Sequence, residues 1–101
     1  MNDRMTRTEK LARMFKVLSV ETRVRMIQLL RSRPLCVNAL ARQLGITPAA
    51  VSQHLRVLRD AGIVSGVKKG FFVHYRLNKE TLARWRKLAG DLLGEKKSKV
   101  S

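Results

Sequence analysis

The sequence predicts a mainly α-helical, α+β fold of about five helices and a two-stranded β-hairpin. Apolar residues recur at helical spacing over most of the chain, a Gly-Ile-Thr-Pro stretch separates two short helical segments, and one later segment alternates apolar with polar residues. The 101 residues allow one domain, with a radius of gyration of about 13 Å if compact. We expect a flexible N-terminal arm over residues 1–8, a folded domain over 9–94 and a Lys-rich tail over 95–101.

Two amphipathic helices are expected before Pro34, which ends the second because the residue before a proline avoids the helical region. The first begins at Glu9, and i, i+3, i+4, i+7 spacing relates its apolar residues Leu11, Met14, Phe15 and Leu18. The second begins near Glu21. Its expected inner face consists of Val24, Ile27 and Leu30, widened by Met26 and Leu29.

A short helix from Val37 to Leu44, a tight turn and a longer helix to about Ala61 are expected next. Gly45 suits a helix C-terminus, and Thr47 followed by Pro48 suits the start of the next helix. The longer helix has a buried stripe, Val51, Leu55 and Leu58. Its opposite side carries Ala49, Ser52, Gln53 and Arg56. Two helices joined in this way indicate a helix-turn-helix.

A β-hairpin and a last helix complete the predicted fold. The hairpin pairs residues 63–67 with 71–77, and its turn is expected to contain Lys68, Lys69 and Gly70. Because an isolated hairpin is marginally stable, it must pack against the helices. The last helix runs from about Lys79 to Leu93, with an apolar stripe of Leu82, Trp85, Leu88, Ala89 and Leu92.

The charge distribution points to a polyanionic partner. Lys plus Arg number 22 and Asp plus Glu number 7, which gives a formal net charge of +15. Asp60 is the only acidic residue from Thr22 to Lys79. Ordinary solubilising surfaces mix both signs, so this segment indicates a binding face. Nucleic acid is the first candidate partner, and an acidic membrane surface is the second.

Several motifs resemble the ArsR family of bacterial and archaeal repressors. Residues 18–30 (LSVETRVRMIQLL) resemble the family's second helix, residues 40–45 (LARQLG) its third, and residues 47–64 (TPAAVSQHLRVLRDAGIV) its recognition helix. Residues 71–77 (FFVHYRL) resemble a strand of its wing. The resemblance covers residues 11–93 and implies a winged helix-turn-helix that binds double-stranded DNA as a homodimeric transcriptional repressor.

In this binding mode the longer helix of the helix-turn-helix enters the major groove. Ser52 and Gln53 can reach base edges, and Gln pairs well with adenine. Arg56 can read guanine or hold a phosphate, and its position favours phosphate. His54 is at least as well explained by packing as by a base contact. Including the wing, the expected DNA-binding residues are Thr47, Pro48, Ala49, Ser52, Gln53, His54, Arg56, Lys68, Lys69 and Arg76.

The family's first and last helices usually form its dimer interface. The matching residues here are Leu11, Met14, Phe15, Leu82, Trp85, Leu88 and Leu92. For Trp85, a role in the monomer core is an equal alternative. Two-fold symmetry would place two recognition helices about 34 Å apart on an inverted-repeat operator.

The sequence departs from the family's metal-sensing sites. The Cys-x-Cys pair at the start of the third helix is reduced to Cys36, because Asn38 replaces the second thiol. The last helix contains Asp91 but no histidine, whereas the family's other site uses Asp and His there. Soft metal ions need several thiolates or imidazoles, so we expect no metal and no cofactor. Cys36 is expected to be a small packed residue, since an oxidant sensor usually has a resolving cysteine.

A second class of function stays open: a winged-helix module for non-specific nucleic-acid binding, chromosome architecture or protein docking. An enzyme is not expected, because the chain has two histidines, one cysteine, scattered acids and no Gly-rich phosphate loop. No apolar run approaches the ~20 residues of a membrane span, and the N-terminus has no secretory signal. With a single cysteine, these features favour the cytoplasm. The effector is unknown.

Overall fold

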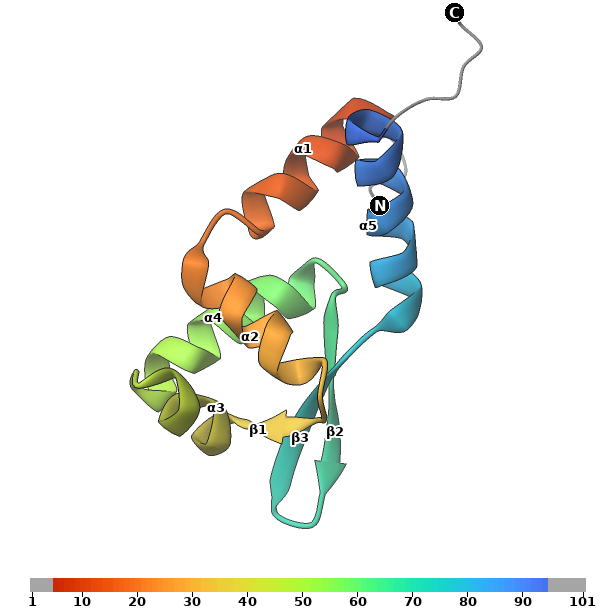
Figure 1. Ribbon diagram of the computed structural model, residues 1–101. Helices are drawn as coiled ribbons and strands as arrows, with labels where there is room; N and C mark the ends of the chain where they lie inside the picture. The colour runs from red at the N-terminus through yellow and green to blue at the C-terminus, as the bar shows by residue number, and fades with distance from the viewer. Residues whose placement is uncertain (1–4, 95–101) are drawn as a thin grey trace, which may run out of the picture.

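The computed structural model describes residues 5–94, which form five helices and three strands (Figure 1). Residues 1–4 of the expected arm and the whole expected tail, 95–101, lie outside the described residues. In chain order the elements are α1 (Arg7–Val17), α2 (Glu21–Leu30), β1 (Leu35–Cys36), α3 (Val37–Leu44), α4 (Pro48–Asp60), β2 (Val64–Lys69), β3 (Phe72–Leu77) and α5 (Lys79–Leu93). This confirms the predicted mainly helical class with a hairpin wing.

Helix α1 begins two residues before the predicted start at Glu9, because its N-terminus is capped on both sides. The Thr6 hydroxyl accepts from the Glu9 amide at 3.0 Å, and the Glu9 carboxylate accepts from the Thr6 amide at 2.9 Å. This reciprocal capping box satisfies two backbone donors that a helix otherwise leaves unpaired. Arg7 and Thr8, expected in the flexible arm, are therefore helical.

The sheet has three strands rather than the two that the sequence predicts. Its order is β1-β3-β2, with antiparallel pairing throughout. The additional strand β1 pairs Leu35 with Tyr75 and Cys36 with His74. A strand of two residues is too short to show an alternating pattern. Its formation depends on β3, which lies beside it only in the folded chain.

The hairpin turn also differs from the prediction. Lys68 and Lys69 belong to β2, and the two-residue turn consists of Gly70 and Phe71. Gly70 has a φ of 62° at the first turn position, a conformation that glycine adopts without steric cost. Phe71, expected to begin the second strand, instead lies at the turn and is 98% exposed.

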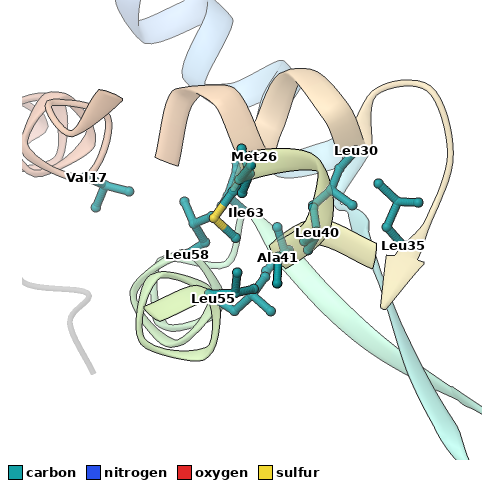
Figure 2. Packing of buried hydrophobic residues seen from close by; sticks show 12 residues of the cluster. Val17, Met26, Leu30, Leu35, Leu40, Ala41, Leu55, Leu58 and Ile63 are labelled. Atoms are coloured by element: carbon teal, nitrogen blue, oxygen red, sulfur yellow. The ribbon is translucent and has the colours of Figure 1, made fainter. Parts of the chain in front are cut away.

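The hydrophobic core lies between α2, α3, α4 and the start of β2 (Figure 2). Met26, Leu40, Leu58 and Ile63 are fully buried there. The three predicted buried residues of α4, Val51, Leu55 and Leu58, all join this core. The predicted inner face of α2 is partly wrong: Met26 and Leu30 are at its centre, whereas Val24 is 37% exposed. Periodicity alone does not fix which side of a broad apolar stripe meets the neighbouring helices.

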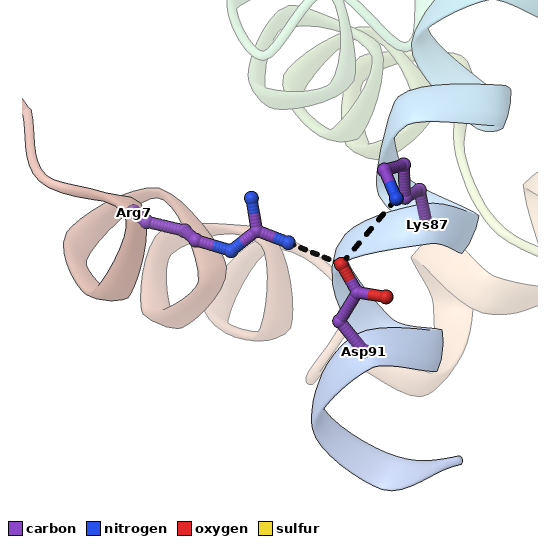
Figure 3. Close-up of polar contacts among 3 residues, drawn as sticks. All are labelled: Arg7, Lys87 and Asp91. Carbon is purple, nitrogen blue, oxygen red and sulfur yellow. Dashed lines mark hydrogen bonds and ion pairs between the residues drawn. The ribbon is translucent and has the colours of Figure 1, made fainter. Parts of the chain in front are cut away.

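The described chain is elongated, with principal extents of 55 × 28 × 21 Å. Its radius of gyration of 15.6 Å exceeds the expected value for a compact domain. Figure 1 shows the reason: α1 and α5 pack together at one end, and the wing projects at the opposite end. Arg7 on α1 forms an ion pair with Asp91 on α5, and Lys87 approaches the same carboxylate at 3.6 Å (Figure 3).

Asn78 fixes the junction between the wing and α5. Its side-chain amide donates to the Gly62 carbonyl at 2.7 Å, and its carbonyl oxygen accepts from the Ser65 hydroxyl at 2.9 Å. Its backbone amide also donates to the Ile63 carbonyl at 2.9 Å. One residue thereby connects the end of β3 to the turn between α4 and β2.

Candidate nucleic-acid interface

The start of α4 is held in place by the turn that precedes it. Gly45 ends α3 in the left-handed conformation, with a φ of 71°. Thr47 then caps α4, because its hydroxyl accepts from the Ala50 amide at 3.1 Å. Pro48 occupies the first helical turn, where its missing amide hydrogen has no cost. The predicted helix-turn-helix is therefore present, and these contacts set the direction of α4.

The outer face of α4 is exposed as the periodicity predicts. Ala49, Ser52, Gln53 and Arg56 are all exposed, and none of them is acidic. His54 is half-buried beside the apolar stripe, which agrees with a packing role at least as well as with a base contact. The face thus combines short polar groups with one guanidinium, the side-chain types that read base edges and hold phosphates.

The wing adds cations to the same end of the molecule. Figure 1 shows the start of α4 and the tip of the wing on the side away from α1 and α5. Lys68 and Lys69 are exposed neighbours on β2, so they project from opposite faces of the hairpin. Arg76 pairs with Ser65 nearer the base of the wing. Every wing residue selected from the sequence is therefore on the hairpin, although the two lysines are not in its turn.

A basic groove beside the wing was not identified from the sequence. It has a volume of about 1230 Å³ and lies between the loop after α2 and the start of α5. Its lining contains one acidic residue, Glu80, and five cationic residues: Arg31, Arg33, Arg76, Lys79 and Arg86. In the sequence, the only sign of this groove is the acid-poor segment from Thr22 to Lys79. A charge pattern along the chain does not show that residues near the end of α2, in β3 and in α5 line one groove.

The predicted dimer residues lie on α1 and α5, mostly at the other end of the molecule. Leu82, near the start of α5, instead lines the basic groove. Phe15 and Leu92 are 38% and 56% exposed, while Met14 is only 3% exposed within the single chain. Trp85 is half-buried against the edge of the core. A cleft of about 680 Å³ between α1, α5 and the end of α4 exposes part of Trp85 and Leu88. Trp85 therefore contacts the core and is also accessible to a partner.

The described residues do not assemble a metal-binding set. Between residues 5 and 94, no three His, Cys, Asp or Glu side chains lie close enough to hold one ion. Cys36 is half-buried opposite His74 in the sheet, and His74 Nδ1 finds no hydrogen-bond partner within the described chain. Asp91 is engaged by Arg7 and Lys87. One thiol and one imidazole fall short of the three or four ligands of a zinc site.

A helix-turn-helix followed by a basic β-hairpin defines a winged helix-turn-helix protein. Within residues 5–94, no helix is long and apolar enough to cross a membrane. Residues 21–65 match the family model described as bacterial regulatory protein, arsR family. The chain belongs to the ArsR family, as its motifs predict.

Two curated relatives illustrate the similarity. The arsenic resistance transcriptional regulator ArsR1 of Pseudomonas putida is 43% identical over 67 residues, which are 65% of this chain and 52% of that protein. The chain thus spans about half the length of this relative. The transcriptional repressor SdpR of Bacillus subtilis is 32% identical over 68 residues, 67% of this chain and 76% of that protein.

A solved structure shares this fold. It is the homodimeric winged helix-turn-helix DNA-binding domain of a possible ArsR-family transcriptional regulator from Mycobacterium bovis. The TM-score is 0.71 at 22% identity, and the match covers 100% of this chain and 97% of that one.

Proposed function

We propose that this protein is a transcriptional repressor that binds double-stranded DNA sequence-specifically, as a homodimer on an inverted-repeat operator. The observation that carries the proposal is the exposed set Ala49, Ser52, Gln53 and Arg56 on the outer face of α4, with no acidic residue before Asp60 at the helix end, at the same end of the molecule as the lysines of the wing. The helix supplies groups for base edges in the major groove, and the wing supplies cations for phosphates or the minor groove. The family membership supports the same function. Such a role belongs in the cytoplasm.

Selection of bound duplexes from a random pool tests sequence specificity. We expect the purified protein to recover an inverted-repeat consensus whose half-site centres are about 34 Å apart, one helical turn. Recovery of no consensus, with equal affinity for unrelated duplexes, would instead support a non-specific architectural protein.

The exposed apolar residues of α1 and α5 support dimerisation through that end of the molecule. Phe15, Leu92 and Leu93 all lie there and are accessible to solvent in the single chain. We expect sedimentation to give twice the 11.5 kDa mass of one chain. Leu92→Glu should produce monomers, because a buried carboxylate without a partner is costly. A stable Leu92→Glu dimer would exclude this interface.

We further propose that DNA binding does not depend on a metal or metalloid, because the described residues do not fit the family's metal sites. The expected result is an operator affinity unchanged by Zn²⁺, Cd²⁺ or arsenite. An ion that releases DNA from wild type but not from Cys36→Ser would contradict this proposal.

A further inference from the structure

The tip of the wing carries an aromatic side chain that nothing in the described chain covers. Phe71 is 98% exposed, and the adjacent Phe72 is 55% exposed. In β2 only Val64 is buried, and the four residues from Gly66 to Lys69 are all exposed. The outer part of the hairpin therefore extends beyond the core by about 13 Å, because each of these four strand residues adds about 3.3 Å.

The two-residue turn presents one side chain at its apex, because Gly70 has none. The minor groove of B-form DNA is about 6 Å wide and 7.5 Å deep, too narrow for a two-stranded ribbon with its side chains. The groove can admit a single side chain from the apex. Phe71 is therefore the wing residue placed to enter deepest.

The flanking charges identify DNA as the occupant. Lys68 and Lys69 project from opposite faces of the ribbon just before the apex, so each can approach one of the two phosphate backbones that border the groove. The segment from Ala61 to Lys79 contains no acidic residue. An apolar side chain between two cations matches a minor groove, with its apolar base faces between two rows of phosphates.

We propose that Phe71 is a wedge that enters the minor groove beside each half-site, partly unstacks one base step and bends the duplex. Apolar side chains inserted in this way kink DNA towards the major groove, most easily at flexible pyrimidine–purine steps. The inference rests on the proposed function, since α4 must first place the wing against the duplex. It adds a sequence preference outside the bases that α4 contacts.

The experiment uses the full chain and a duplex recovered from the random-pool selection. End-attached donor and acceptor dyes report bending, and 2-aminopurine placed at successive flanking steps reports unstacking. Wild type should bend the duplex and raise 2-aminopurine emission at one step per half-site. Phe71→Ala should abolish both signals and weaken binding by about 10- to 100-fold, the effect of losing one buried phenyl group. Phe71→Leu should restore both signals in part.

Two further variants separate the wedge from general effects. Val24→Ala removes a 37% exposed apolar side chain from α2, outside the proposed DNA-binding face and dimer interface, and should change neither signal. Lys69→Ala should weaken binding while the saturated complex stays bent and unstacked.

Phe71→Ala complexes that bend and unstack DNA like wild type would overturn the inference. So would loss of binding to anionic vesicles in Phe71→Ala without any change in DNA bending. Failure of wild type to bind any duplex would instead contradict the proposed function itself.

Discussion

At the scale of single residues, Gln53 and Lys69 should contribute to DNA binding in different ways. Gln53 is exposed on the outer face of α4, where its amide can form two hydrogen bonds with adenine. Lys69 is exposed on the wing, where its ammonium group can neutralise a phosphate of any sequence. The first contact discriminates between bases, and the second does not.

We therefore expect Gln53→Ala to lower operator affinity by about 1–3 kcal/mol while affinity for random DNA changes little. Lys69→Ala should weaken operator and random duplexes by the same factor. Competition binding with both duplexes measures each ratio. Equal losses on the two duplexes for Gln53→Ala would show that this side chain does not read bases.

The helices and the wing show how far sequence patterns determine individual elements. The stripe of α4 could be predicted because Val51, Leu55 and Leu58 follow one narrow row, and all three are buried. The capping box of Thr6 and Glu9 also has a recognisable Thr-x-x-Glu spacing, although the prediction began the helix at Glu9. Strand β1 and the basic groove depend on long-range contacts that no local pattern contains.

The orientation of α2 can be tested by comparing two of its apolar residues. Met26 is fully buried, whereas Val24 is 37% exposed. Met26→Ala should lower the free energy of unfolding by about 2–5 kcal/mol, because it leaves a cavity in the core. Val24→Ala should cost less than about 1 kcal/mol, since an exposed methyl group loses little packing. Urea denaturation of both variants measures the difference. Similar costs would indicate that α2 packs through the face first predicted from its sequence.

The junction between the wing and α5 should depend on the side chain of Asn78. Asn78→Ala removes the hydrogen bonds to the Gly62 carbonyl and the Ser65 hydroxyl. We expect a loss of about 1–3 kcal/mol in the free energy of unfolding, because a partly buried carbonyl is left without its donor. Ser65→Ala removes only one of these bonds and should cost less. If Asn78→Ala is no more costly than Ser65→Ala in denaturant unfolding, the bond to Gly62 contributes no stability.

At the scale of the whole molecule, the elongated shape separates the two proposed functions, dimerisation and DNA binding. The proposed dimer residues lie on α1 and α5, and the proposed DNA contacts lie at the opposite end, on α4 and the wing. The cations behind the net charge of +15 are found at both ends of the molecule. At the α1–α5 end, the cleft is lined by Arg7, Lys10, Arg13 and Lys87. The net charge therefore does not indicate how many cations contact DNA. That number depends on where the cations lie.

The salt dependence of DNA affinity distinguishes the effect of where a cation lies from the effect of the protein's total charge. Lys68→Gln and Lys10→Gln each lower the net charge by one, but Lys68 is on the wing and Lys10 is on α1. Each phosphate neutralised on DNA contributes about −0.9 to the slope of log affinity against log salt concentration, because it releases condensed counterions. Lys68→Gln should make the slope shallower by about 0.9 for each protomer whose wing contacts the duplex. Lys10→Gln should leave the slope unchanged.

Fluorescence anisotropy over a salt series measures both slopes. An equal change for the two variants would mean that the duplex responds to the overall field of the protein rather than to contacts made by the wing.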